Sequence, residues 1–141
     1  MSTITDTIQS AQRRAAEIRP NVGGFPVLAE VLRHAGIHRN EWTLPAGQAV
    51  YLTDAGAVVE PATPLISAIS EVPAFDRGAV IDALRADEAG HTTFPQFLTA
   101  IWSAGVIAYA VDLDRRTVTY RGIDNATYVE SYPDVEISPI S

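Results

Sequence analysis

Three histidines are the residues of this chain whose type and spacing come closest to a metal site. His34 and His38 are four residues apart, as two ligands on one face of a helix would be, and His91 could join them. Gly36 lies between the first two and is typical of a residue that ends a helix, which would break that relation. We therefore expect no metal site, with His34 at a helix C-terminus and His91 in a loop.

Asp112 and Asp114 could offer two carboxylates to a divalent cation. Arg115 and Arg116 follow at once, so we expect a hairpin turn in which the acids pair with these arginines at the surface. Catalytic serines in a G-x-S-x-G or S-x-x-K pattern and glycine-rich nucleotide loops are absent from the sequence. We expect no catalytic residue, metal or cofactor on these grounds.

Aromatic side chains and the charged groups beside them are the strongest candidates for a binding site. Most tyrosines lie in the C-terminal third of the chain, and Trp42 and Tyr51 occupy the corresponding part of the first half. Large aromatic residues in strands usually form core. The alternative is a groove whose tyrosine hydroxyls, with an arginine or a glutamate, contact a small ligand or a peptide. The candidate contact residues are Trp42, Tyr51, Tyr109, Tyr120, Tyr128, Arg121 and Glu130.

The elements that must position these residues begin with two helices. Apolar residues spaced three and four apart predict a helix from Ile4 that ends before Pro20, and a second helix from Pro26 that ends at Gly36. Strands are expected at 40–44, 48–53 and 57–60, with turn residues between them.

The second half predicts the same kinds of element. Asp76 is typical of the N-cap of a helix that stops near Gly90, and Thr93 with Gln96 has the spacing of a capping box that opens another helix. Gly105 is expected to end that helix. Three strands of an antiparallel meander are expected at 106–113, 117–121 and 127–131.

The two halves align without a gap when the second is shifted by 69 residues. Phe25-Pro26 falls on Phe94-Pro95, Ala35-Gly36 on Ala104-Gly105, and Tyr51 on Tyr120. Common capping residues could produce part of this match by coincidence, but the register also holds into the strands. We interpret it as an internal duplication whose two lobes, related by a pseudo-twofold axis, leave a seam that is either a binding groove or core.

The predicted fold is therefore α+β, with two similar helix-helix-antiparallel-sheet units in a single domain, 1–141. The halves span about 4–60 and 74–133, and a tail follows at 134–141. The connection, 61–73, carries Leu65, Ile66, Ile69 and Val72, which are too apolar to be left in water, so we expect it to be ordered.

Composition excludes several function classes. The 141 residues carry a formal charge of −7 without a lysine, and an acidic surface argues against nucleic-acid binding. No apolar run reaches the roughly 18 residues of a membrane span. The chain has no cysteine and its N-terminus lacks the features of a secretory signal, so we expect a cytoplasmic protein without disulfides.

Six short motifs are specific in combination. They are Arg19-Pro20-Asn21-Val22-Gly23-Gly24-Phe25-Pro26 with Leu28-Ala29-Glu30, Tyr51-Leu52-Thr53-Asp54, Thr93-Phe94-Pro95 with Phe97, Trp102-Ser103-Ala104-Gly105-Val106, Arg116-Thr117-Val118-Thr119-Tyr120, and Tyr128-Val129-Glu130-Ser131-Tyr132-Pro133. Over about 15–133 the chain resembles the DUF1398 family of small bacterial proteins, whose members are often labelled "phage envelope protein". The resemblance implies no established activity, cofactor or catalytic residue.

We expect a non-enzymatic protein of bacterial or prophage origin that acts by binding a partner protein or itself. The alternative is a small-molecule-binding protein or enzyme that uses the groove between the lobes, with Glu30, Asp112 or Glu130 as acid or base.

A homodimer is also expected from the strand pattern. If Tyr51 faces the core, Val50 and Leu52 face the opposite way and need a cover, from the other lobe or from a second subunit.

Overall fold

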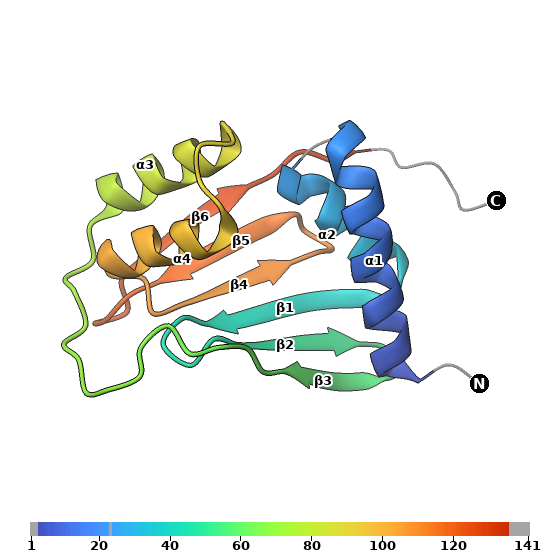
Figure 1. Ribbon diagram of the computed structural model, residues 1–141, viewed down its shortest axis with the longest axis horizontal. Helices are drawn as coiled ribbons and strands as arrows, with labels where there is room; N and C mark the ends of the chain where they lie inside the picture. The colour runs from blue at the N-terminus through green and yellow to red at the C-terminus, as the bar shows by residue number, and fades with distance from the viewer. Residues whose placement is uncertain (1–2, 23, 136–141) are drawn as a thin grey trace.

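A computed structural model describes residues 3–22 and 24–135, apart from the side chains of 15–22 and 24. Its elements follow in the order α1 (Ile4–Val22), α2 (Gly24–His34), β1 (Ile37–Thr43), β2 (Gln48–Thr53), β3 (Gly56–Glu60), α3 (Arg77–Glu88), α4 (Phe94–Ser103), β4 (Ala108–Asp112), β5 (Thr117–Arg121) and β6 (Thr127–Ser131). The six strands form one antiparallel sheet in the order β3-β2-β1-β4-β5-β6 (Figure 1). The predicted α+β class is confirmed.

The helices pack on one face of the sheet, and the core forms between the two layers. Figure 1 shows α1, α3 and α4 in front of the strands. Tyr51, Val111 and Val118 point from the sheet toward the helices and are at most 6% exposed. They pack with buried helical residues such as Leu32 and Ile101. Because strand side chains alternate, the neighbours of these residues point to the opposite face.

The sheet consists of two three-stranded meanders joined through β1 and β4. Glu41 lies opposite Ala110 in the middle of the β1–β4 pairing, and these two residues are themselves 69 positions apart. The same shift relates the other registers, since Asn40 lies opposite Tyr51 and Tyr109 lies opposite Tyr120. The sheet therefore has a local twofold axis through the Glu41–Ala110 pair, and its origin by duplication stays a prediction.

The strand pairing between the halves differs from the expectation of a separate small sheet in each half, with a seam between them that is either a groove or core. Five consecutive residue pairs, from Arg39–Asp112 to Thr43–Ala108, join β1 to β4 as an antiparallel ladder. Backbone pairing between distant strands is set by main-chain groups, which the side-chain pattern of either strand does not reveal. The halves thus share one sheet.

The predicted helix ends are confirmed where capping chemistry fixes them. The Asp76 carboxylate accepts the Ala79 N–H at 3.0 Å at the start of α3, and Thr93 with Gln96 forms both bonds of a capping box at the start of α4. Gly36 and Gly105 follow α2 and α4 with φ of 92° and 93°. This left-handed conformation, which favours glycine, turns the chain into β1 and toward β4.

The predicted end of α1, before Pro20, is wrong. The helix continues past Pro20 to Val22, because a proline in the last turn removes a single backbone donor and leaves the preceding bonds intact. Of the expected turn after it, Gly23 lies outside the described residues and Gly24 already begins α2.

The connection between the halves has no helix or strand from 61 to 76 and is fixed near both ends. The Leu65 N–H donates to the Pro45 carbonyl, and the Asp76 N–H donates to the Ala104 carbonyl. Between them, Ile69 is fully exposed at 105%, so the expectation that its apolar side chain avoids water is wrong. No helix in the described part of the chain is long and apolar enough to cross a bilayer.

Candidate functional site

Four of the predicted contact residues form one row across the covered face of the sheet. Trp42, Tyr109, Tyr120 and Tyr128 lie on adjacent strands, with successive ring centroids 6.2, 5.8 and 6.4 Å apart. Phe94 of α4 makes an edge-on contact with Trp42 at 5.4 Å. Burial raises the pKa of the Tyr109 and Tyr120 hydroxyls, so both stay neutral. The row packs against the core beneath the helices, and ligand binding to it stays a prediction.

Tyr51 lies on the same face but makes a separate polar contact. Its hydroxyl oxygen is 3.1 Å from Nε2 of Gln12 and 3.5 Å from Oε1 of Glu60. Gln12 Nε2 also donates to Glu60 Oε2 at 3.1 Å. Burial raises the pKa of Tyr51, which keeps its proton available for this contact between α1, β2 and β3.

Glu130 is held by groups from α3 and from its own strand. Arg85 donates to both carboxylate oxygens of Glu130, at 2.7 and 3.1 Å, and the Tyr128 hydroxyl donates at 2.6 Å. The Arg85 hydrogen bonds are the main reason that the pKa of Glu130 is lowered. Arg77 lies 5.2 Å from the centre of the Tyr128 ring. Glu130 is therefore ionised and ties β6 to α3.

Arg121 is separated from the other predicted contact residues, because it belongs to the opposite face of the sheet. We call this surface the open face. Its side chains are Ala57 and Val59 of β3, Gln48, Val50 and Leu52 of β2, Arg39, Glu41 and Thr43 of β1, Ala108, Ala110 and Asp112 of β4, Thr117, Thr119 and Arg121 of β5, and Thr127, Val129 and Ser131 of β6.

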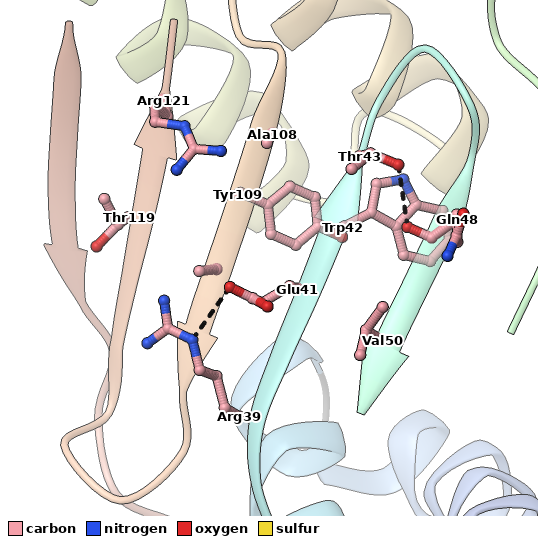
Figure 2. Close-up of a pocket in the computed structure, with 11 residues that line it drawn as sticks. Arg39, Glu41, Trp42, Thr43, Gln48, Val50, Ala108, Tyr109, Thr119 and Arg121 are labelled. Carbon is pink, nitrogen blue, oxygen red and sulfur yellow. Dashed lines mark hydrogen bonds and ion pairs between the residues drawn. The ribbon is translucent and has the colours of Figure 1, made fainter. Parts of the chain in front are cut away.

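A hollow of about 300 Å³ lies on the open face at the β1–β4 seam (Figure 2). The small side chains of Ala108 and Ala110 form its floor, and longer side chains of the neighbouring strands, Arg39 on β1 and Arg121 on β5, rise beside it. Trp42 and Tyr109 also line it. A hollow between the halves is therefore present, although the aromatic row packs on the far side of the sheet.

His38 of β1 contacts two turns at one end of the sheet. Its Nε2 lies 2.6 Å from Asp54 Oδ1 in the β2–β3 turn, and its Nδ1 lies 3.0 Å from Asp114 Oδ2 in the β4–β5 turn. Hydrogen bonds to these carboxylates, Asp54 first, raise the pKa of His38. As predicted, α2 ends before Gly36, so His34 and His38 do not share a helix.

The Asp112 turn forms as expected, but only one of the two arginines that follow it lies near Asp112. Asp112 Oδ1 accepts the N–H groups of Asp114 and Arg115, as in an Asx turn. Arg115 Nε lies 3.9 Å from Asp112 Oδ2, whereas Arg116 contacts Asp134 at 3.0 Å. Ion pairing with Asp112 is therefore weak, and Arg116 is used elsewhere.

Glu30 on α2 is a buried carboxylate that the sequence suggested only as one possible acid or base. Glu30 is 5% exposed, and its Oε1 lies 2.6 Å from Arg33 Nη2 and 2.9 Å from His34 Nε2. Its Oε2 lies 3.8 Å from Arg116 Nη2 in the β4–β5 turn. The Arg33 hydrogen bond outweighs burial and lowers the pKa of Glu30. The i, i+4 spacing of Glu30 and His34 could have shown the α2 part of this cluster, but no sequence pattern points to Arg116.

The described residues contain no group of three histidine, aspartate or glutamate side chains placed to hold an ion. His91, the third histidine, lies exposed in the loop between α3 and α4.

The chain is similar in sequence to uncharacterized mycobacterial proteins and to one protein family. An uncharacterized protein of Mycobacterium tuberculosis (strain H37Rv) and one of Mycobacterium bovis are each 53% identical over 138 residues. Each match covers 98% of this chain and 84% of the relative. The model of a family described as "Protein of unknown function (DUF1398)" matches residues 13–131. The chain belongs to the DUF1398 family.

Proposed function

We propose that the protein acts by self-association, with the open face of one copy packed against the open face of a second. The observation that carries this proposal is the position of Val50 and Leu52. Both point away from the core because Tyr51 between them points into it, and each side chain stays partly exposed. In this proposal the protein is a non-enzymatic binding protein, and its cytoplasmic location and prophage origin stay predictions.

The composition of the open face supports a protein contact. An antiparallel sheet tolerates water on one face, so exposure alone is no argument. Here, however, Val59 and Val129 at the two sheet edges are each 55% exposed. Val50 and Leu52 on β2 and the two alanines of β4 add further apolar surface, separated by the polar and charged side chains of β1 and β5. Valines, alanines and threonines on a flat sheet are typical of surfaces that pack face to face in sandwiches.

The charge of the open face supports a second copy as the partner. The whole chain carries −7, so two copies repel each other over most of their surfaces. On the open face, Arg39 and Arg121 balance Glu41 and Asp112. A surface that is neutral and carries both signs can meet itself without repulsion.

The size of the open face sets the expected strength of the dimer. Six strands spaced about 4.8 Å apart and five residues rising about 3.4 Å each give a surface of roughly 25 by 17 Å. This is at the small end of specific interfaces, so we expect a dissociation constant in roughly the micromolar range.

Sedimentation velocity between about 1 µM and about 1 mM, a range that brackets such a constant, tests the proposal. We expect the wild type to shift from monomer to dimer and Leu52→Glu to remain monomeric, because it places a charge in the interface. Ile69→Glu is the matched control, since it adds the same charge at a fully exposed apolar residue outside the open face. A wild type that stays monomeric throughout contradicts the proposal.

The hollow favours small-molecule binding as a second candidate function. Arg39 and Arg121 flank it, and it lies on the open face at the seam between the two halves. A ligand held there would protect the wild type against thermal unfolding, and Arg121→Ala would lose that protection. Self-association without any added ligand favours the first candidate.

A further inference from the structure

The Glu30 cluster on α2 brings more basic than acidic groups to one end of the sheet. Arg33 and His34 from α2 contact the Glu30 carboxylate, and Arg116 approaches it from the β4–β5 turn. Glu30 is the buried member, whereas the side chains of Arg33, His34 and Arg116 are 36%, 48% and 28% exposed. A buried carboxylate thus holds three partly exposed basic side chains close together.

Arg116 has a donor that its neighbours do not use. Its Nε is buried and has no hydrogen-bond partner in the described structure, although buried donors are nearly always paired. Its backbone also adopts the left-handed conformation, with φ of 56°, which costs a residue with a side chain energy. The equivalent position in the first half, 69 residues earlier, is Gly47 with φ of 67°. The turn therefore keeps an arginine where glycine would fit better.

Asp134, in the segment after β6, supplies the anion that Arg116 contacts. Its Oδ1 lies 3.0 Å from Arg116 Nη2. The pKa of Arg33 is raised chiefly by its hydrogen bond to Glu30, and the charges of Asp134 and Asp114 add to this effect. The Asp134 side chain is 66% exposed and belongs to no helix or strand. An exposed carboxylate on such a segment can be exchanged for another anion at little cost.

We propose that Arg33, His34 and Arg116 form a binding site for an oxyanion, the carboxylate or phosphate group of a small molecule, and that Asp134 occupies this site in its absence. The planar guanidinium forks match both kinds of oxyanion. The Arg116 Nε and Nη2 groups lie on one edge of its fork, so an anion that replaces Asp134 can accept from both. The site is independent of the open face.

Titration of the full-length protein with inorganic phosphate, and separately with acetate, tests the proposal at constant ionic strength. The readout is the NMR signal of the Arg116 Nε–H group, with the His34 ring signals as a second reporter. We expect saturable binding of at least one of the two anions. Tighter binding of phosphate identifies a phosphate-bearing ligand, and tighter binding of acetate identifies a carboxylate.

Four variants separate this site from general charge attraction. Arg116→Gly should weaken binding by at least about tenfold, as the loss of a charge-assisted hydrogen bond does, whereas Arg115→Ala, which removes a neighbouring exposed arginine, should leave it unchanged. Asp134→Asn should tighten binding several-fold because the competing carboxylate is gone. Glu71→Gln is the control, because it removes the same charge from the exposed connection, and it should leave the binding affinity unchanged.

The outcomes that overturn the proposal are equally definite. Titrations that never saturate, equal weakening by Arg116→Gly and Arg115→Ala, or unchanged affinity in Asp134→Asn each contradict it. Circular dichroism establishes that Arg116→Gly is folded. Should it unfold, Arg116→Lys, which keeps the charge but has no Nε donor or fork, takes its place and is expected to bind phosphate less tightly than the wild type.

Discussion

Arg116 occupies a backbone conformation that Gly47 adopts at the equivalent position of the first half. The two turns differ in what surrounds them. A Cβ at Gly47 would lie 2.5 Å from the Thr63 carbonyl oxygen, so glycine is required there by contact as well as by φ. Arg116 carries a full side chain in the corresponding turn, directed at Glu30 and Asp134. The left-handed backbone at position 116 thus occurs with a side chain that makes charged contacts, and not with a glycine.

Arg116→Gly should consequently be more stable than the wild type. Glycine relieves a left-handed strain of about 1 kcal/mol, and the lost contact with the exposed Asp134 contributes little. Arg116 lies 3.8 Å from Glu30, which keeps its closer partners on α2. Urea denaturation measures the free energy of unfolding, and Arg116→Lys, which keeps the strain, should show no gain. A marked loss of stability in Arg116→Gly would mean that its ion pairs outweigh the strain.

His38 should make stability depend on pH. Its pKa is raised on folding from its usual value of 6.5, chiefly by Asp54 and then by Asp114. The stabilisation is therefore complete below the unfolded pKa and is lost as the pH rises through the folded pKa. Between about pH 6 and pH 9, the melting temperature of the wild type should fall by more than that of His38→Gln.

His91→Gln is the control for this effect, since it removes an exposed histidine from a loop. Parallel profiles for the wild type and His38→Gln would exclude a role for the two aspartates in stability. Because His38 is well exposed, the difference is expected to be small and to shrink in high salt.

At the scale of the elements, α2 and α4 end in the same way but are packed differently. Gly36 and Gly105 follow them with nearly equal φ. A Cβ at Gly36 would meet nothing within 4 Å, whereas one at Gly105 would lie 2.5 Å from the Ala74 carbonyl oxygen and from the Phe75 Cα. The end of the connection is therefore pressed against the α4–β4 turn, and the first half has no counterpart of this contact.

The matched pair Gly36→Ala and Gly105→Ala measures that contact. Gly36→Ala should cost about 1 kcal/mol, the usual penalty of a left-handed alanine. Gly105→Ala should cost clearly more, because backbone atoms of the connection must also move away. Chemical denaturation gives both values, and equal losses would show that the connection yields without cost.

Elements with a local signal could be predicted from the sequence. Strands β2, β5 and β6 occur at the predicted residues, and the caps at Asp76 and Thr93 form as expected, because alternation and capping depend on neighbouring residues. The pairing of β1 with β4 could not be predicted, since it joins main-chain groups far apart in the chain. The sequence placed Arg116 in a hairpin turn but could not predict its contact with Glu30 or its left-handed backbone, because both follow from tertiary structure.

The candidate contact residues predicted from the sequence do not form a single site in the structure. The aromatic row forms as one group because its residues share the alternation of their strands. Arg121, adjacent to Tyr120, points to the open face by the same alternation. The expectation that Val50 and Leu52 face away from the core also followed from this rule, and the structure places them there.

At the scale of the molecule, the four helices and the core lie on one side of a six-stranded sheet, and the open face lies on the other (Figure 1). The local twofold axis passes through Glu41 and Ala110, in the middle of the open face. The hollow lies over the same β1–β4 seam. A neutral sheet face with apolar and polar side chains, on an acidic protein, is the feature that self-association through this face would use.

The most direct test of self-association through the open face is a distance measurement by pulsed electron paramagnetic resonance between spin labels in the dimer. The chain has no cysteine, so Thr119→Cys on the open face and Thr99→Cys on the exposed side of α4 each introduce a single labelling site. Packed sheets lie about 10 Å apart, so labels at position 119 should lie within roughly 30 Å of each other. Labels at position 99, each separated from the interface by a sheet and a helix layer, should lie more than about 40 Å apart. A short distance at position 99, or none at position 119, would contradict packing through the open face.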